Sequence, residues 1–174
     1  LFSHSGYHGV TVDAIAKQAG ISKGNLYWYF KSKQEILQLL FDDIAVQLFW
    51  PFVEIMEGDR SPRDKLRAFA ECSLDSAEAN PEALQLMWQI ASQPELRELL
   101  SSEYSMWMIP FLDYLTPLFA QIGDENPHST AVLYAFTLDA LMFLAAIGSS
   151  IYDRGELLAG LKAKFVDSGR GEND

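Results

Sequence analysis

The chain has 174 residues, of which 49% are hydrophobic and 13% aromatic, and its formal net charge at pH 7 is −11. This composition excludes a disordered chain, and the single cysteine, Cys72, excludes an internal disulfide and fits a reducing cytoplasm. The net charge argues against nucleic-acid binding, but residues 1–33 carry four lysines and one acid, a local charge of +3, against −14 for residues 34–174.

Helical patterning runs along the whole chain, and no period-2 alternation is present, so we predict an all-α fold. In the N-terminal segment, three hydroxyl residues each stand directly before an expected helix and can cap it: Thr11, Ser22 and Ser32. Gly20 ends the first of these helices, and the third runs to Pro51 or kinks there. The chain begins at Leu1 rather than Met, so we expect a helix preceding these to be truncated.

The second part of the chain is also divided by proline and glycine. A linker at 57–62 precedes a helix that begins at Pro62 and ends at Asn80, and another helix covers 82–92. The longest apolar stripe follows, and it contains Pro110, which we expect to kink or split the helix.

The last two predicted helices are 129–152 and 155–167. The first is apolar all round and long enough to span a membrane, but Asp139 near its centre opposes insertion. A soluble helix of this kind must be buried all round, which packing against a second copy would achieve. We therefore predict no membrane association and a homodimer interface that contains Leu138, Leu141, Met142, Ala145, Ser149, Leu158, Leu161 and Phe165.

Residues 11–33 have the pattern of a helix-turn-helix. Ala16 is small enough for a second helix to cross closely, Gly20 can adopt the left-handed turn, and Leu26 can anchor the second helix. The outward face of that helix would carry polar donors and aromatic rings suited to DNA bases and sugars. These residues are Lys23, Gly24, Asn25, Tyr27 and Trp28.

The N-terminal sequence closely resembles the TetR family of repressors over about 35 residues. The matching runs are Gly6-Tyr7-His8-Gly9-Val10-Thr11, Ile15-Ala16, Ala19-Gly20-Ile21-Ser22-Lys23-Gly24 and Leu26-Tyr27-Trp28-Tyr29-Phe30-Lys31-Ser32-Lys33. The resemblance implies about nine helices, a DNA-binding domain at 1–46 and a ligand-binding and dimerisation domain at 47–174. It also implies a homodimeric repressor that a small effector releases from operator DNA.

The same resemblance assigns roles to single residues. Lys23, Gly24, Tyr27 and Trp28 would reach bases, whereas Thr11, Ser22, Asn25, Tyr29 and Lys33 would hold phosphates. Packing in the core is the alternative for Tyr29, and solvated surface is the alternative for Lys33.

Aromatic and apolar side chains of the C-terminal part suggest an effector pocket, with an aromatic-rich core as the alternative. The candidates are Phe49, Phe52, Met87, Trp88, Tyr104, Trp107, Met108, Phe111, Tyr134, Asp139 and Phe143. Asp139 favours either a cationic lipophilic effector or a structural role in the core or at the dimer seam. No metal-spaced pair, phosphate loop or catalytic set is present, so we expect no cofactor, metal or enzyme activity. A helical binding or interaction protein without DNA affinity is the second hypothesis.

Overall fold

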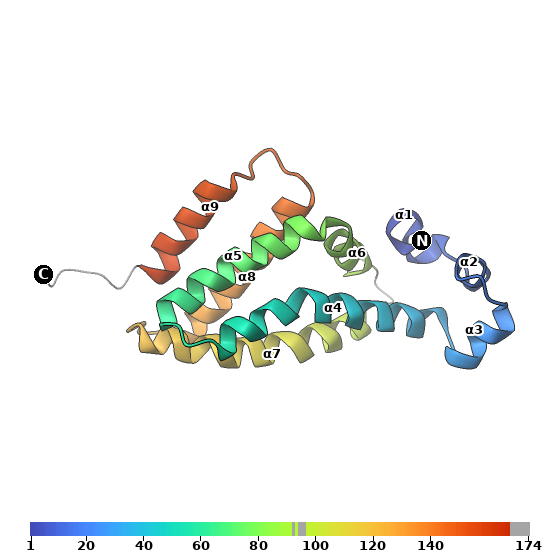
Figure 1. Cartoon of the computed structure of the whole chain (residues 1–174), viewed down its shortest axis with the longest axis horizontal. Coiled ribbons are helices and arrows are strands. Elements are labelled where there is room, and N and C mark those ends of the chain that lie inside the picture. Colours follow the sequence, from blue (N-terminus) through green and yellow to red (C-terminus); the bar gives the residue numbers. More distant parts are fainter. Residues whose placement is uncertain (92, 94–96, 168–174) are drawn as a thin grey trace, which may run out of the picture.

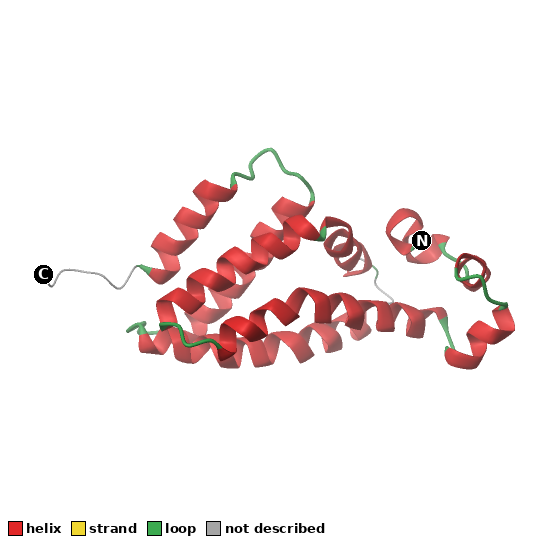
Figure 2. Ribbon diagram, viewed as in Figure 1, coloured by secondary structure: helices red, strands yellow, loops and turns green. Residues whose placement is uncertain are grey.

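The structure is a computed structural model that describes residues 1–91, 93 and 97–167, without the side chains of 49, 89–91 and 97–104. The described residues form nine α-helices and a π-helical turn, and no strand lies among them, which confirms the all-α prediction (Figure 2). The helices are α1 (Phe2–Gly9), α2 (Val12–Gln18), α3 (Lys23–Tyr29), α4 (Lys33–Glu57), α5 (Pro62–Ala79), α6 (Pro81–Ala91), α7 (Arg97–Gln121), α8 (Pro127–Ala146) and α9 (Arg154–Leu161), followed by the turn η2 (Lys162–Val166).

Side-chain hydroxyl groups cap the N-termini of α2, α3 and α4, as predicted. Each of the three hydroxyls accepts a hydrogen bond at 3.1 Å from the backbone N–H three residues later: Thr11, Ser22 and Ser32. Gly20 has φ +70°, which lets the chain reverse within three residues after α2.

The helices form two packed regions along one elongated body (Figure 1). Helices α1, α2 and α3 lie at one end, and α4 runs from them into the body beside α7. The main core joins α4, α5, α7, α8, α9 and η2, and its largest fully buried side chains include Phe69, Phe119 and Tyr134. A second cluster joins the N-terminal helices to the body, because Phe2 of α1 and Phe41 of α4 pack with Leu84 of α6 and Ala146 of α8.

Three prolines lie inside helices rather than ending them. Helix α4 continues through Pro51 to Glu57, and α7 continues through Pro110 and Pro117, so an end near Pro51 and a split at Pro110 are excluded, while a kink at either proline is compatible with the continuous helices. A proline inside a helix costs about 3 kcal/mol. Burial of Phe52, directly after the first of these prolines, and of Phe111, directly after the second, offsets that cost.

The predicted helix 129–152 is shorter at its C-terminal end than its apolar pattern indicated. Pro127 occupies the first turn of α8, and the helix ends at Ala146. Gly148 follows with φ +62°, a left-handed conformation that ends the helix, and Ser149 lies in the turn beyond it.

Ion pairs attach α9 and η2 to α5. Arg154 lies 2.6 Å from Asp75 and 2.8 Å from Glu78, and Lys162 lies 2.5 Å from Glu71. The Tyr152 hydroxyl also donates to Glu78, and burial together with this carboxylate raises the pKa of Tyr152 to about 12. These contacts position the last helix over α5.

The side chains proposed for the dimer interface lie mostly inside the protomer, which corrects the sequence-based choice. Leu138, Leu141, Leu158 and Leu161 are buried in the main core. Met142 and Phe165 pack against that core, Ala145 packs against the second cluster, and Ser149 is half-buried. Because α8 is apolar on every face, its sequence does not indicate which face packs inward.

Helices α4 and α8 are long and apolar enough to cross a membrane by length and composition, a test that core helices of soluble proteins also pass. Asp42 and Asp43 lie within α4, and Asp139 lies within α8. Each carboxylate at the centre of a bilayer would cost about 2.5–3.5 kcal/mol. Because both helices also supply buried side chains, such as Leu48 and Tyr134, we interpret them as core helices.

Candidate DNA-binding surface and effector cleft

Helices α2 and α3 form a compact corner that exposes one face of α3. Ala16 of α2 is 3% exposed and Leu26 of α3 is 5% exposed, so these two side chains hold the helices together. On the other side of α3, the leading residues Lys23, Gly24 and Asn25 are all exposed. The corner therefore presents the first turn of α3 to solvent, as a helix that enters a DNA groove requires.

Three consecutive aromatic residues extend this exposed face. Tyr27 is 46% exposed, Trp28 79% and Tyr29 62%, and the rings of Trp28 and Tyr29 meet edge to face with centroids 4.7 Å apart. Phe30, in contrast, is half-buried. The exposure of Tyr29 disfavours the alternative in which it packs in the core. Exposed aromatic rings in a row are unusual for a surface without a partner.

Two lysines of the N-terminal segment already have protein partners. The Lys33 ammonium donates to the carbonyls of Tyr7 at 2.6 Å and Val10 at 2.9 Å, and it lies 4.1 Å from the centre of the Tyr7 ring. Lys33 therefore ties the end of α1 to the start of α4 instead of pointing to solvent, where the sequence-based assignment placed it. The Lys23 ammonium lies 2.8 Å from the carboxylate of Asp13, a contact that the sequence did not suggest.

The hydroxyls of Thr11 and Ser22 cap α2 and α3, and both residues are exposed. A capping hydroxyl accepts through its oxygen and keeps its own O–H to donate. Both residues can therefore cap a helix and still donate to a phosphate oxygen.

Most of the residues proposed for an effector pocket are packed against other side chains within the two clusters. Phe52, Met108, Phe111 and Tyr134 are buried in the main core. The rings of Phe52 and Phe111 lie 5.7 Å apart, and each also contacts Phe69. Tyr134 is fully buried and donates its hydroxyl to the Leu66 carbonyl, and its burial raises its pKa. These side chains fill the space between the helices themselves.

The other proposed pocket residues are distributed over the body. Met87 and Trp88 pack against the second cluster, and the Trp88 ring meets the ring of Phe143 at 4.9 Å. Trp107 and Asp139 are half-buried, and both take part in contacts within the protein. The side chains of Phe49 and Tyr104 lie outside the described residues.

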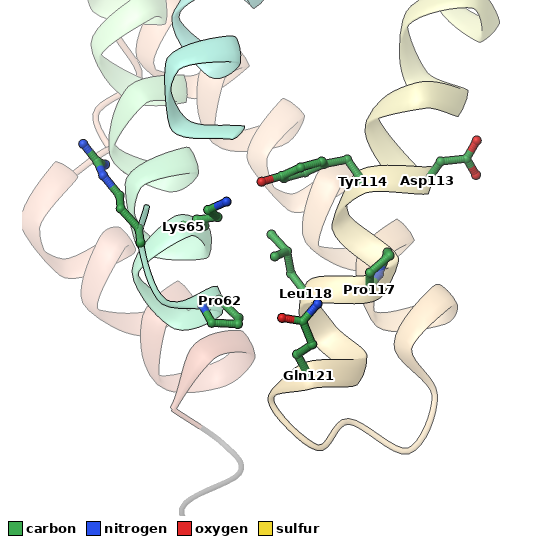
Figure 3. Close-up of a pocket in the computed structure, with 8 residues that line it drawn as sticks. Pro62, Lys65, Asp113, Tyr114, Pro117, Leu118 and Gln121 are labelled. Carbon is green, nitrogen blue, oxygen red and sulfur yellow. The ribbon is translucent and has the colours of Figure 1, made fainter. Parts of the chain in front are cut away.

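A cleft with a volume of about 340 Å³ lies between the start of α5 and the second half of α7 (Figure 3). Its size falls in the range of small-molecule sites. Its lining combines cationic, polar and apolar side chains: Arg60, Pro62, Lys65, Asp113, Tyr114, Pro117, Leu118 and Gln121. In Figure 3, Tyr114 extends from α7 toward Lys65, whereas the carboxylate of Asp113 points away from it.

The cleft is joined to both the end of α4 and the aromatic core. The Lys65 ammonium donates to the Met56 carbonyl at 2.8 Å, and the Tyr114 hydroxyl donates to the same oxygen at 3.1 Å. The Tyr114 ring also meets the buried Phe69 ring with centroids 5.8 Å apart. Among the described residues, no group of three or more His, Cys, Asp or Glu side chains could hold a metal ion.

This cleft was not predicted, although the sequence contains a signal for it. Four of the nine cationic residues in 34–174 fall within residues 60–67. In an acidic body this cluster of cations stands out. The cluster lines a cleft only because α7 brings Tyr114 and Gln121 next to it, from more than 45 residues away in the sequence.

The fold and the exposed corner define a helix-turn-helix protein with an all-helical C-terminal domain. Residues 1–40 match the profile of the family described as bacterial regulatory proteins, tetR family. The fatty acid metabolism regulator protein of Bacillus subtilis is 44% identical over 59 residues, which make up 34% of this chain and 28% of that protein. The aligned stretches span less than half the length of the first curated relatives.

The similarity of fold extends over the whole chain. A TetR-like regulator from Rhodococcus sp. RHA1 superposes with a TM-score of 0.79 at 19% identity, covering 98% of this chain and 90% of that one. FadR from Bacillus subtilis, solved in complex with stearoyl-CoA, superposes with a TM-score of 0.73 at 21% identity, covering 95% of this chain and 91% of that one. The N-terminal residues thus match the TetR family of transcriptional regulators, and the whole chain shares the fold of TetR-like regulators.

Proposed function

We propose that the protein is a homodimeric transcriptional repressor that binds a pseudo-palindromic operator through α2 and α3. The observation that carries this proposal is the exposed face of α3, where Lys23, Tyr27 and Trp28 all point out of a corner held by Ala16 and Leu26. The basic N-terminal segment would dock on DNA, while the acidic body would be repelled by it. A protein of this kind works in the cytoplasm, and occupancy of the operator would exclude RNA polymerase.

The direct test is binding to DNA that flanks the protein's own gene, measured by fluorescence anisotropy at several salt concentrations. We expect sub-micromolar affinity for a site whose half-sites lie about one helical turn, or a small multiple of it, apart. If a dimer neutralises about eight phosphates, log affinity should fall with log salt with a slope of about −7. Absence of binding, or binding that does not depend on salt, would contradict the proposal.

We expect Trp28→Ala to weaken specific DNA binding at least tenfold without destabilising the fold. The side chain is 79% exposed, so its removal should change the free energy of unfolding by less than about 0.5 kcal/mol. Its contact with base or sugar would be lost in both heads of a dimer. Trp50→Ala is the matched control, because Trp50 is 65% exposed on α4 outside the corner. Equal effects of the two variants on DNA affinity would exclude α3 as the recognition helix.

A second copy of the chain is the partner that the exposed face of α8 suggests. Four apolar residues on this helix and Ile147, directly after its end, are exposed at alternating spacings of three and four; the four are Leu133, Phe136, Ala140 and Phe143. This spacing places them on one stripe, which is the pattern that packs helix against helix across a seam. We propose this stripe as the dimer interface in place of the buried leucines.

We further propose that the cleft between α5 and α7 binds an effector with an anionic head and an apolar tail. Arg60 and Lys65 supply positive charge, and the carboxylate of Asp113 is turned away from Lys65. Tyr114 leads from the cleft to the buried aromatic rings, where an apolar tail could enter. The complex of the structurally similar FadR with stearoyl-CoA supports the same chemical class. A cationic lipophilic effector is disfavoured, because Asp139 is not among the cleft residues.

Helix α4 provides a route from this cleft to the DNA-binding end. Its last turn is held by Lys65 and Tyr114 through the Met56 carbonyl, and its first turn is held by Lys33. A helix of 25 residues is about 37 Å long, so α4 connects the cleft directly to the DNA-binding end. An anionic effector group that competes for Lys65 would release the Met56 carbonyl and let α4 tilt. This tilt would change the spacing of the two DNA-binding domains of the dimer on DNA.

Effector binding can be tested with two probes that share a tail and differ in head charge. We expect dodecanoate to release the protein from operator DNA and dodecylamine to be inert. Arg60→Met should weaken the response to dodecanoate about tenfold, because a charge-assisted hydrogen bond contributes roughly 1.5–3 kcal/mol. Lys164→Met, which removes the same charge from the exposed surface of η2, is the control. Release by the amine, or equal responses of the two variants, would contradict an anion-binding cleft.

A further inference from the structure

One ion pair crosses the corner between the two helices of the DNA-binding motif. The Lys23 Nζ lies 2.8 Å from an Asp13 carboxylate oxygen, and it donates a hydrogen bond to it. Lys23 is the first residue of α3, and Asp13 is the second residue of α2. The side chains are 50% and 65% exposed, so the pair faces solvent on the surface that would face DNA.

This pair is unexpected in a DNA-binding head. Asp13 is the single acidic residue among residues 1–33. Of the four lysines there, Lys33 is bound by backbone carbonyls, and Lys17 and Lys31 are exposed and form no ion pair with any residue that the structure describes. The one acid of the head therefore neutralises the one lysine that begins the recognition helix. An exposed ion pair contributes little to folding stability, and the helix dipole that favours an acid in the first turn of α2 does not require a lysine partner for Asp13.

We propose that Asp13 is a specificity-determining residue that suppresses binding to non-cognate DNA, an inference that rests on the proposed operator binding. A phosphate near the paired groups is attracted by Lys23 and repelled by Asp13, so the pair gains little from the backbone alone. An ammonium has three N–H donors, and one is used by Asp13. The other two remain to reach acceptors such as guanine O6 and N7. Lys23 then contributes mainly at sites that present such a base edge.

A purely structural tether between α2 and α3 is the competing explanation, and Asp13→Asn separates the two. Asparagine has nearly the same shape and keeps an oxygen that can accept from Lys23, but it has no charge. A tether would survive this substitution, and DNA binding would not change. If the charge is what matters, binding to random DNA must rise, because the repulsion is removed while Lys23 stays.

The experiment measures affinities of the full chain for operator DNA and for random-sequence DNA of equal length, over a salt series. For Asp13→Asn we expect affinity for random DNA to rise about fivefold per head, or about twenty-five-fold for a dimer with both heads on DNA. The salt dependence on random DNA should steepen by about 2, one counterion for each head. Operator affinity should rise less, so the ratio of specific to non-specific binding should fall.

Two further variants make the result decisive. Asp43→Asn removes the same charge from the middle of α4, and it should leave the ratio unchanged. In a Lys23→Met background, Asp13→Asn should change the ratio by less than half as much, because Asp13 acts through Lys23. An unchanged ratio in Asp13→Asn, with wild-type operator binding intact, would overturn this inference alone. Failure of the wild-type chain to bind any DNA would overturn the proposed function as well.

Discussion

Leu133→Asp should convert the dimer to a monomer and reduce operator affinity by at least a hundredfold. Leu133 is 61% exposed on the stripe of α8 that we propose as the interface, so a carboxylate there leaves the protomer core intact. In a symmetric interface the new charges from the two copies would be buried and unpaired near one another. A monomer binds only one half-site, and it loses the high effective concentration that links the second head, typically worth 10²–10⁴ in affinity.

The oligomeric state can be measured by analytical ultracentrifugation, with DNA affinity measured in the same buffer. Leu39→Asp is the matched control, because Leu39 is 56% exposed on α4 and lies outside the α8 stripe. It should leave the dimer mass unchanged. A Leu133→Asp protein that remains dimeric would show that another surface forms the interface.

Phe69→Ala should lower the free energy of unfolding by about 3–5 kcal/mol. Phe69 is fully buried on α5, and its ring meets those of Phe52, Phe111 and Tyr114 at centroid distances of 5.5, 5.7 and 5.8 Å. Its removal would therefore leave a cavity where α4, α5 and α7 meet, and the surrounding rings can collapse only partly.

Urea unfolding at one fixed protein concentration measures this effect, because the proposed dimerisation would make the apparent stability depend on concentration. Trp50→Ala removes a larger but 65% exposed ring, and its unfolding free energy should change by less than about 0.5 kcal/mol. A loss below about 1 kcal/mol for Phe69→Ala would contradict the packing described for this cluster. Because Tyr114 belongs to both the cluster and the cleft, the Phe69 variant should also alter the response to dodecanoate.

Features that depend on neighbours three or four residues away could be predicted from the sequence. The caps at Thr11, Ser22 and Ser32 need only a hydroxyl and a free N–H in the first turn. The left-handed turn at Gly20 needs only a residue without a side chain. The match to the tetR family model was predictable for the same reason, since the matching residues form one short segment.

The residues that the ammonium groups of Lys33 and Lys23 contact could not be predicted from the sequence. Lys33 meets the Tyr7 and Val10 carbonyls only because α1 folds back on the start of α4. Lys23 meets Asp13 only because the turn at Gly20 places α3 across α2. Exposed lysines are the default for a basic segment, and the family resemblance assigned both of them to DNA without indicating these contacts.

The sequence by itself determined the helical fold and the helix-turn-helix segment that matches the tetR family model, because these follow from local hydrogen bonds and apolar periodicity. Only the tertiary structure decided which face of α8 is exposed on the protomer. Leu138 and Leu141 pack inward while Leu133 and Ile147 stay exposed, and an all-apolar helix carries no periodicity that distinguishes them. The position of the cleft that we propose as the effector site was decided in the same way, since aromatic side chains that converge can fill the space they were expected to line. The open cleft instead lies where α5 and α7 separate.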